Sequence, residues 1–450
     1  MQPSNGIIIA GVHSSSGKTA VTCMVLAALA ERKLPVQPFK AGPDFIDPGY
    51  HNRFAGGAVS RNLDRWLMGE KNVAREAALH TTGCLGVLEG VMGLFDGSDS
   101  QSDEGSTMEL ARQLDWPVVL VLPSGKAGRS LAATLRGFIA EAGPGRIAGV
   151  ILNQVNGSSH ADYLREAIAP LGLPVFGSIP PCDELHWPER HLGLQASQER
   201  ELPSRSELAQ LAEKHLDIAG LLALLSPVSE KVPARFFPES HLRIGIARDQ
   251  AFHFYYEANL DYLRDAGTEL IEFSPLQDST LPHDLDGLLF GGGFPEVFAD
   301  QLAQNQSLRA EVHDQIESGL PCYAECGGLM YLAQELITRN GKSFPMAGVI
   351  PGAVEMTSKL HHFGYCLAAR NDDAESAVFH GHEFHHSIWR AEKERANLWN
   401  VRRKRAGSER REGCRLHNLH ASYVHLHFAS SGAVAQSLFN LQAKPEVARI

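Results

Sequence analysis

Two stretches of this 450-residue sequence carry residue types whose spacing could do chemistry. The first, Gly11-Val-His-Ser-Ser-Ser-Gly-Lys-Thr19, has the glycine, lysine and hydroxyl residues of a loop that holds phosphate groups. The second, Tyr323-Ala-Glu-Cys-Gly-Gly328, places a cysteine before two glycines, where its sulfur could hold an acyl group. A chain that contains both sites is expected to couple two reactions.

The phosphate loop is preceded by a predicted strand and followed by a predicted helix, which is the setting that a nucleotide site needs. Backbone N–H groups of the loop and of the helix N-terminus would bind phosphate oxygens. Lys18 would reach the β- and γ-phosphates, and the Thr19 hydroxyl would help to hold Mg²⁺. The alternative is a serine-rich turn that precedes Gly-Lys-Thr by coincidence. The predicted ATP-binding residues of the loop are Gly11, Ser16, Gly17, Lys18 and Thr19.

Five residues separate the two glycines of the loop, one more than in the usual pattern. This spacing resembles the loop of dethiobiotin-synthetase-like proteins, in which ATP activates a carboxylate. Acidic residues that fit such chemistry follow two predicted strands, at 39–47 and 89–97, where open α/β sheets bind ligands. As an alternative, Asp44 and Asp47 only cap turns beside the neighbouring prolines. The predicted Mg²⁺ ligands are Thr19, Asp44 and Glu89, and the predicted contacts of the substrate or its acyl phosphate are Asp47 and Asp96.

The thiol site has the pattern of a nucleophile on a sharp turn. Cys326 follows an apolar strand predicted over 320–323 and precedes two glycines and a helix predicted over 329–336. Such a turn would project the thiol into a cleft, and the backbone N–H groups that follow could stabilise an oxyanion. A second glycine-rich loop, at 290–296, also follows a strand. The predicted oxyanion donors are Gly292, Gly293 and Gly327.

The thiol also needs a base, and two histidines are candidates. Residues 423–428 alternate as a strand, so His425 and His427 are expected on one face. Either could lower the pKa of the thiol and move protons, and a purely structural role is the alternative. A second histidine cluster favours strand packing or substrate contact over metal binding. It comprises His380, His382, His385 and His386.

Composition and charge limit the classes of function. The hydrophobic content of 44% and the charged content of 21% are ordinary for a globular protein. A net charge of -11 argues against a nucleic-acid partner, and an anionic substrate would need a local basic pocket. The chain has no apolar run of membrane-spanning length and no charged leader, so we expect a cytoplasmic protein without membrane contact. Seven scattered cysteines without a CxxC pair do not indicate a zinc site or a disulfide framework.

Alternating strand and helix patterns predict an α/β protein of two parallel-sheet, three-layer domains. The first alternation contains strands at 6–10, 36–40, 85–89, 118–122 and 147–152, with helices at 18–32, 107–114 and 130–140. The second begins with a strand at 242–247 and a helix at 255–265. We predict domains over 1–228 and 241–450, joined by a proline- and serine-rich linker over 229–240. The basic segment 402–411 is expected to be a solvated loop.

Seven segments together resemble the cobyrinic acid a,c-diamide synthase family, including its hydrogenobyrinic acid counterpart. The order and spacing of the segments carry the resemblance, which covers nearly the whole chain. The segments are QPFKAGPDFID at 37–47, EGVMGLFDG at 89–97, PERHLGL at 188–194, GGGFPE at 291–296, YAECGGLMYL at 323–332, GHEFHHS at 381–387 and SYVHLHF at 422–428.

The resemblance implies an ATP- and glutamine-dependent amidation of the a and c carboxylates of cobyrinic or hydrogenobyrinic acid, in cobalamin biosynthesis. A P-loop NTPase-like domain over 1–228 would bind ATP, Mg²⁺ and the corrinoid substrate and form an acyl phosphate. A class I glutamine amidotransferase-like domain over 241–450 would release ammonia from L-glutamine at Cys326. By the same resemblance, His425 is the partner of Cys326 and Asn153 reads the adenine. A homodimer is compatible with these features.

The sequence departs from the family pattern at three places, one of which is the basic segment 402–411. Residues 13–16 replace glycines of the phosphate loop, but ATP binding is expected to survive because backbone N–H groups do not depend on them. Pro123 replaces an acidic residue in the turn 121–130, so no role is assigned to that turn.

Two other functions stay open as alternatives. Cobyric acid synthase, a sibling enzyme, amidates other side chains of the same ring, and segments 188–194 and 422–428 favour the diamide synthase over it. A non-catalytic P-loop switch of the partitioning ATPase type would not need Cys326 or a histidine partner, yet both are present.

Overall fold

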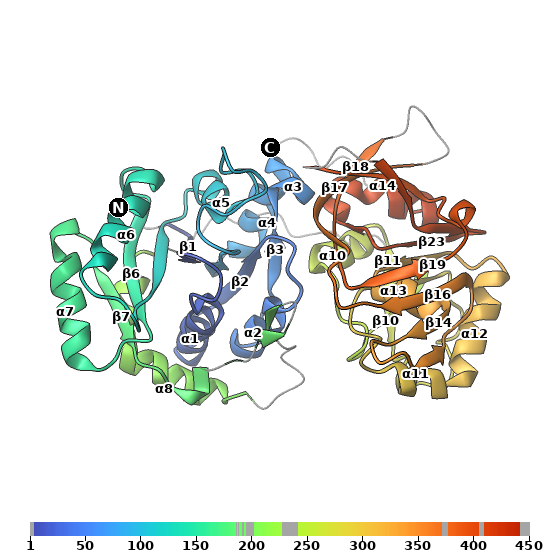
Figure 1. Ribbon diagram of the computed structural model, residues 1–450, viewed down its shortest axis with the longest axis horizontal. Coiled ribbons are helices and arrows are strands. Elements are labelled where there is room, and N and C mark those ends of the chain that lie inside the picture. The colour runs from blue at the N-terminus through green and yellow to red at the C-terminus, as the bar shows by residue number, and fades with distance from the viewer. Residues whose placement is uncertain are drawn as a thin grey trace. The chain divides into compact units, whose positions relative to one another are not determined.

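The computed structural model describes residues 4–185, 187, 189–190, 193–194, 202–226, 242–370, 377–404 and 409–441. The chain divides into two compact units, residues 1–234 and 235–450, which Figure 1 colours from blue to green and from yellow-green to red. The predicted linker at 229–240 lies outside the described residues. Within the described part of the chain, every helix is too short or too polar to cross a membrane.

A seven-stranded sheet, parallel throughout, organises the first unit in the order β3-β2-β4-β1-β5-β6-β7. The strand β1 lies at the centre, and each of its residues is buried, so helices must cover both faces of the sheet. The sequence runs of isoleucine and valine in these strands are typical of a sheet buried in this way. The strands are β1 (Gly6–Gly11), β2 (Val36–Ala41), β3 (Arg61–Leu63), β4 (Leu85–Glu89), β5 (Val118–Pro123), β6 (Ile147–Asn153) and β7 (Val175–Ile179).

Helices and one large aromatic residue cover the two faces of this sheet. On one face, Ile7 and Ile9 share a core with α1, which also packs against α2 and α8. On the other face, Trp116 lies where a Cβ at Gly6 or Gly86 would come within 2.6 Å of its ring. The helices are α1 (Lys18–Glu31), α2 (Asp47–Phe54), α3 (Arg65–Met68), α4 (Glu70–Thr81), α5 (Thr107–Leu114), α6 (Ser130–Ala142), α7 (Ser158–Ile168), α8 (Arg205–His215) and α9 (Ile218–Leu222). Two strands of two residues each, β8 (Glu189–Arg190) and β9 (Gly193–Leu194), form a short antiparallel ribbon.

The second unit is built on a six-stranded sheet in the order β11-β10-β12-β13-β23-β22, parallel except at β22. Its strands are β10 (Leu242–Ala247), β11 (Thr268–Phe273), β12 (Gly287–Phe290), β13 (Cys322–Glu325), β22 (Cys414–Leu416) and β23 (Leu419–Ser422). Its helices are α10 (Glu257–Asp265), α11 (Ala299–Gln304), α12 (Gln306–Glu317), α13 (Gly327–Leu332) and α14 (Phe428–Phe439). The predicted fold class is therefore confirmed.

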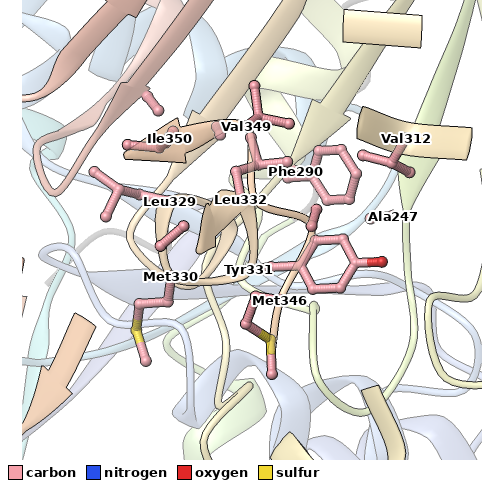
Figure 2. Close-up of a cluster of buried hydrophobic side chains, with 14 of the residues drawn as sticks. Ala247, Phe290, Val312, Leu329, Met330, Tyr331, Leu332, Met346, Val349 and Ile350 are labelled. Carbon is pink, nitrogen blue, oxygen red and sulfur yellow. The ribbon is translucent and has the colours of Figure 1, made fainter. Parts of the chain in front are cut away.

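A core of large apolar side chains fixes α13 directly behind the turn at Cys326. Figure 2 shows Leu329, Tyr331 and Leu332 of this helix among side chains of the sheet and of the segment 346–350. The rings of Tyr331 and Phe290 lie 5.5 Å apart. The first turn of α13 is thus held by packing on the sheet, which a six-residue helix needs because isolated short helices are unstable.

Two further sheets of the second unit were not expected from the sequence. One follows the order β15-β14-β16-β19 and the other is antiparallel in the order β21-β20-β17-β18-β24. Their strands are β14 (Ala333–Ile337), β15 (Ser343–Pro345), β16 (Ile350–Met356), β17 (His362–Arg370), β18 (Val378–His385), β19 (Ser387–Arg390), β20 (Trp399–Arg403), β21 (Glu409–Glu412) and β24 (His425–Leu426).

Three sequence-based expectations for the second unit are wrong. The helix expected over 329–336 ends at Leu332, because Ala333 takes an extended backbone (φ -66°, ψ 168°) and pairs with β16. The basic segment 402–411 contributes to the paired strands β20 and β21 rather than to a loop, although residues 405–408 lie outside the described residues. The strand expected over 423–428 is limited to β24, since α14 starts at Phe428.

Candidate functional site

The phosphate loop lies between the end of β1 and the start of α1, as predicted. Gly17 has the left-handed backbone that the loop needs (φ 90°, ψ 19°) at the N-cap of α1. Ser16 donates its hydroxyl to the carbonyl of His13 at 2.7 Å, and Lys18 donates to the same carbonyl at 3.3 Å. The ammonium of Lys18 is therefore folded back onto the loop.

Asn153 closes the loop from the end of β6. Its side-chain amide donates to the carbonyl of Ser16 at 3.0 Å. A Cβ at Gly17 would lie only 2.1 Å from the same amide nitrogen, so glycine is required there for space as well as for conformation. The structure thus brings Asn153, predicted as a nucleotide contact, onto the phosphate loop.

Glu89 is the centre of the acidic cluster beside the loop. Its Oε1 accepts from the Thr19 hydroxyl at 2.7 Å and from the Lys40 ammonium at 3.1 Å. Its Oε2 lies 2.6 Å from Nε2 of His51, whose Nδ1 lies 2.9 Å from the Ser60 hydroxyl. Burial alone would raise the pKa of Glu89, but Lys40 and these hydrogen bonds hold it well below its usual range, so the carboxylate is ionised.

Lys40 is a functional candidate that sequence reasoning missed. Its Nζ lies 2.6 Å from Oδ2 of Asp47 and donates to the carbonyl of Gly90 at 3.0 Å, in addition to Glu89. Burial favours the neutral amine, but Asp47 and Glu89 outweigh it and raise the pKa of Lys40. The signal was present in the sequence, since Lys40 and Glu89 both end strands. Their contact depends on β2 and β4 being neighbours, which the sequence does not specify.

The remaining predicted carboxylates have distinct places. Asp44 accepts from the backbone N–H groups of Ile46 (2.8 Å) and Asp47 (3.1 Å), so the turn-capping alternative holds for its Oδ1. Asp96 accepts from the N–H of Gly93 at 2.8 Å, inside the loop that follows Glu89. Burial and the neighbouring Asp44 carboxylate raise the pKa of Asp47, against the opposite influence of Lys40.

The residues of this site can hold Mg²⁺ only if phosphate oxygens supply further ligands. No group of three His, Cys, Asp or Glu side chains among the described residues could hold a metal ion alone. Thr19 and Glu89 nevertheless bring two oxygen atoms within 2.7 Å, beside the loop that would hold the phosphates. Mg²⁺ commonly takes one or two protein oxygens and completes its octahedral shell with phosphate and water.

The thiol of the second unit sits on a strained turn. Cys326 has φ 45° and ψ -98°, a conformation that L-residues adopt rarely and that is found at functional sites. Its N–H donates to the carbonyl of Ser422 at 2.7 Å, which ties the turn to the end of β23. The two glycines that follow begin α13, so the predicted elbow is present.

A histidine and a carboxylate complete the thiol site. His425 interacts with the sulfur of Cys326, and its Nδ1 lies 3.0 Å from Oε2 of Glu325. Burial lowers the pKa of His425, but the interactions with Cys326 and Glu325 outweigh it and raise the pKa to about 10. The imidazole is therefore held as a cation beside the sulfur.

Glu325 was also missed, although it precedes the cysteine directly. Its Oε1 accepts from the Tyr323 hydroxyl at 2.6 Å and from the N–H of Leu426 at 3.1 Å. Both carboxylate oxygens are thus engaged, and one of them orients His425. A carboxylate that orients a catalytic histidine commonly comes from another strand. The position of Glu325 next to the cysteine in sequence therefore did not indicate this role.

His427, two residues beyond His425, has a structural contact of its own. Its Nδ1 accepts from the N–H of Ala429 at 3.3 Å and caps the start of α14. Burial lowers its pKa to about 3, so it is neutral. Its backbone is extended (φ -107°, ψ 115°) although β24 ends at Leu426, and its ring lies 5.0 Å from that of Tyr256.

The glycine loops provide candidate oxyanion donors. A Cβ at Gly327 would lie 3.0 Å from the backbone nitrogen of Gly293, so the two predicted donors are adjacent. Among the described residues, no backbone hydrogen bond uses either N–H. The N–H of Gly292 already donates to the carbonyl of Phe254 at 3.3 Å, so this residue lines the site near His425 rather than offering a donor.

Comparison with known proteins agrees with this geometry. Residues 7–194 match the CobQ/CobB/MinD/ParA nucleotide binding domain, and residues 243–433 match the CobB/CobQ-like glutamine amidotransferase domain. The cobyrinate a,c-diamide synthase of Syntrophotalea carbinolica is 41% identical over 96% of this chain and 97% of its own. The chain belongs to the cobyrinate a,c-diamide synthase family.

Other members of the cobyrinate a,c-diamide synthase family show the same relation over their full lengths. The protein of a Synechococcus species is 42% identical over 96% of this chain and 97% of its own. That of Listeria innocua is 40% identical over 97% of this chain and 99% of its own. The resemblance inferred from seven segments is therefore confirmed, as is the presence of nucleotide-binding and glutamine amidotransferase domains in one chain.

Proposed function

We propose that this member of the family amidates the a and c carboxylates of cobyrinic or hydrogenobyrinic acid, with ATP and L-glutamine as co-substrates, in cobalamin biosynthesis. The observation that carries the proposal is a complete pair of sites in a chain aligned end to end with cobyrinate a,c-diamide synthases. One site joins the phosphate loop to the cluster of Lys40 and Glu89, and the other joins Cys326 to His425 and Glu325.

In the proposed synthetase half, the loop N–H groups and Lys18 bind the β- and γ-phosphates of ATP. Thr19, Glu89 and Asp44 would hold Mg²⁺, which when bound would neutralise phosphate charge. Asp47 and Asp96 contact the substrate, and a corrin carboxylate oxygen attacks the γ-phosphorus to give an acyl phosphate and ADP. Asn153 reads the adenine, and its hydrogen bond to the carbonyl of Ser16 in the phosphate loop supports this role.

In the proposed glutaminase half, the thiolate of Cys326 attacks the side-chain carboxamide of glutamine. The N–H groups of Gly293 and Gly327 stabilise the oxyanion, and His425 gives its proton to the departing ammonia. Water, deprotonated by the same imidazole, then cleaves the thioester to glutamate and regenerates the thiol. Ammonia attacks the acyl phosphate, and inorganic phosphate leaves as the amide forms.

The mass of the product tests the proposal. Purified protein is incubated with ATP, Mg²⁺, glutamine and either cobyrinic or hydrogenobyrinic acid, and the corrinoid is analysed by mass spectrometry. Two amides per ring are expected, together with a requirement for divalent metal. Amidation of four side chains would instead assign a cobyric acid synthase activity, and no amidation of either ring would contradict the proposal.

A further inference from the structure

A second histidine lies face to face with the histidine of the thiol site. His382 on β18 is the antiparallel partner of His425 on β24. The two imidazole rings are 4.8 Å apart and inclined by only 13°, which is a stacked arrangement. Both side chains are almost fully buried. No role in the reaction described so far uses His382.

The far side of His382 is also fixed. Its Nε2 lies 2.6 Å from the hydroxyl of Tyr256, the residue that precedes α10. From the next turn of that helix, Asn259 donates to the carbonyl of Leu426 at 2.9 Å and accepts from the N–H of Phe428 at 2.7 Å. The start of α10 therefore holds both the stacked ring and the backbone from the end of β24 to the start of α14.

The charges around the stack are unequal. Burial, His425 and His427 all lower the pKa of His382, which is neutral beside the cationic ring of His425. A cation stacked on a neutral aromatic ring is stabilised, whereas two imidazolium rings would repel each other. The titratable groups that face the pair from neighbouring elements are Glu325, Cys326, Tyr256 and His427.

The known contacts of His425 leave one motion poorly restrained. Glu325 and Cys326 engage the edge of the imidazole, so they fix rotation within the ring plane. A tilt of the plane would lengthen both contacts, and resistance to it has to come from a group against a ring face. Because His382 presents a parallel ring at that face, it restrains the tilt.

We propose that His382 is a positioning residue of the glutaminase site. It holds the ring plane of His425 by stacking and is itself held by Tyr256. The proposal rests on the assignment of His425 as the partner of Cys326. It concerns the rate of the thiol chemistry rather than the binding of glutamine or of the corrinoid.

Kinetics with two nitrogen donors test this role. His382→Ala is expected to lower kcat for glutamine-dependent synthesis by about 10- to 100-fold, the cost of a slightly misplaced catalytic group. KM for glutamine and ammonia-dependent synthesis should change little. His382→Phe keeps a flat ring and should recover most of the loss. His380→Ala, which removes a histidine from the same strand, is the matched control and should leave kcat unchanged.

The reactivity of the Cys326 thiol provides a second measurement. A purely structural role of His382 would leave this reactivity unchanged. The rate of Cys326 alkylation by iodoacetamide, measured against pH, reports the thiolate held by His425. In His382→Ala this profile should move to higher pH, by about one unit. An unchanged kcat and an unchanged alkylation profile would overturn the proposal.

The design also separates this proposal from the underlying assignment. If His382→Ala loses ammonia-dependent synthesis as well, the phenylalanine variant decides. Recovery of activity in His382→Phe supports stacking. A glutamine-specific loss in His382→Phe that equals the loss in a verified folded His382→Ala or His382→Asn protein refutes it. A His425→Ala protein that retains glutamine-dependent synthesis would show instead that the partner of Cys326 was assigned wrongly.

Discussion

Lys40 and Lys18 illustrate how two cations in one site can have opposite energetic roles. Lys40 is paired with two buried carboxylates, so it compensates charge within the folded protein. Lys18 donates to the carbonyl of His13, and burial and repulsion from Lys40 lower its pKa. Lys18 is therefore held in a position that favours an added anion such as a phosphate group.

Substitution of the two lysines should separate these roles. Lys40→Met is expected to destabilise the protein by about 3–5 kcal/mol, because Asp47 and Glu89 lose their buried partner. Lys18→Ala should change stability little, yet abolish synthesis with either glutamine or ammonia while glutaminase activity persists in part. Calorimetry and product assays check both results. Ammonia-dependent synthesis by Lys18→Ala would argue against the phosphate-loop assignment.

The thiol site allows an equally direct comparison. Cys326→Ala should abolish the use of glutamine and leave synthesis from ammonia intact. His425→Ala should lower glutamine-dependent kcat far more than His427→Ala, which removes a helix cap and should cost about 1 kcal/mol of stability. Kinetics with both donors and thermal unfolding make the comparison. The reverse order of the two histidine variants would overturn the assignment of the base.

At the scale of elements, the strands around β23 carry a buried acid that supports the thiol turn. Glu412 at the end of β21 accepts from the Ser422 hydroxyl at 2.5 Å and from the N–H of Tyr423 at 2.7 Å. Ser422 in turn accepts the N–H of Cys326 through its carbonyl. Burial and the carboxylate of Glu383 raise the pKa of Glu412 to about 7, although Arg410 opposes them.

This raised pKa predicts a pH-dependent stability. Between pH 4.5, the ordinary pKa of a glutamate, and about pH 7, the folded protein binds more protons at Glu412 than the unfolded chain does. Stability should therefore fall as pH rises through this window. Glu412→Gln should flatten the decline in melting temperature between pH 5 and pH 8. An equally steep decline in the glutamine variant would show that other groups cause it.

Much of this architecture follows from local sequence, and the exceptions have physical causes. Apolar runs specify the parallel strands, and the phosphate loop and the cysteine turn follow from glycines at fixed spacing. Contacts between elements are different, because the pairing of Lys40 with Glu89 depends on strand order. The different contacts of His425 and His427 depend on neighbouring elements, since Glu325 binds one ring and the start of α14 the other.

The two smaller sheets of the second unit show a second limit of sequence reasoning. Strand β14 follows α13 without a break, and its sequence, AQELI, suits a helix as well as a strand. Pairing with β16 decides between the two, since tertiary context overrides weak local preference. Segments with alternating histidines, such as β18, likewise show their role only when neighbouring strands are known.

At the scale of the whole molecule, the chain keeps two chemistries in two compact units, residues 1–234 and 235–450. Each unit has its own sheet and its own core. The proposed reactions are linked by ammonia, which loses its nucleophilic lone pair when it is protonated in water at neutral pH. Synthesis with glutamine should therefore depend on both sites belonging to the same molecule.

A mixing experiment tests this dependence. Equal amounts of the Lys18→Ala and Cys326→Ala proteins supply both activities on different molecules. With glutamine at pH 7, the mixture should form diamide at a small fraction of the wild-type rate, and the fraction should grow as pH rises. Added ammonium salt should restore synthesis by Cys326→Ala, as a control. A mixture that approaches half the wild-type rate would show that ammonia travels freely through solvent.

The unusual backbone of Cys326 also has an evolutionary consequence. A non-glycine residue at φ 45° and ψ -98° costs of order 1–3 kcal/mol, and glycine would relieve most of that cost. Selection for glutamine use therefore acts against the backbone preference for glycine at this position. In a lineage supplied with abundant ammonia, drift would be expected to fix glycine here. The descendant would be a more stable protein whose second domain no longer uses glutamine.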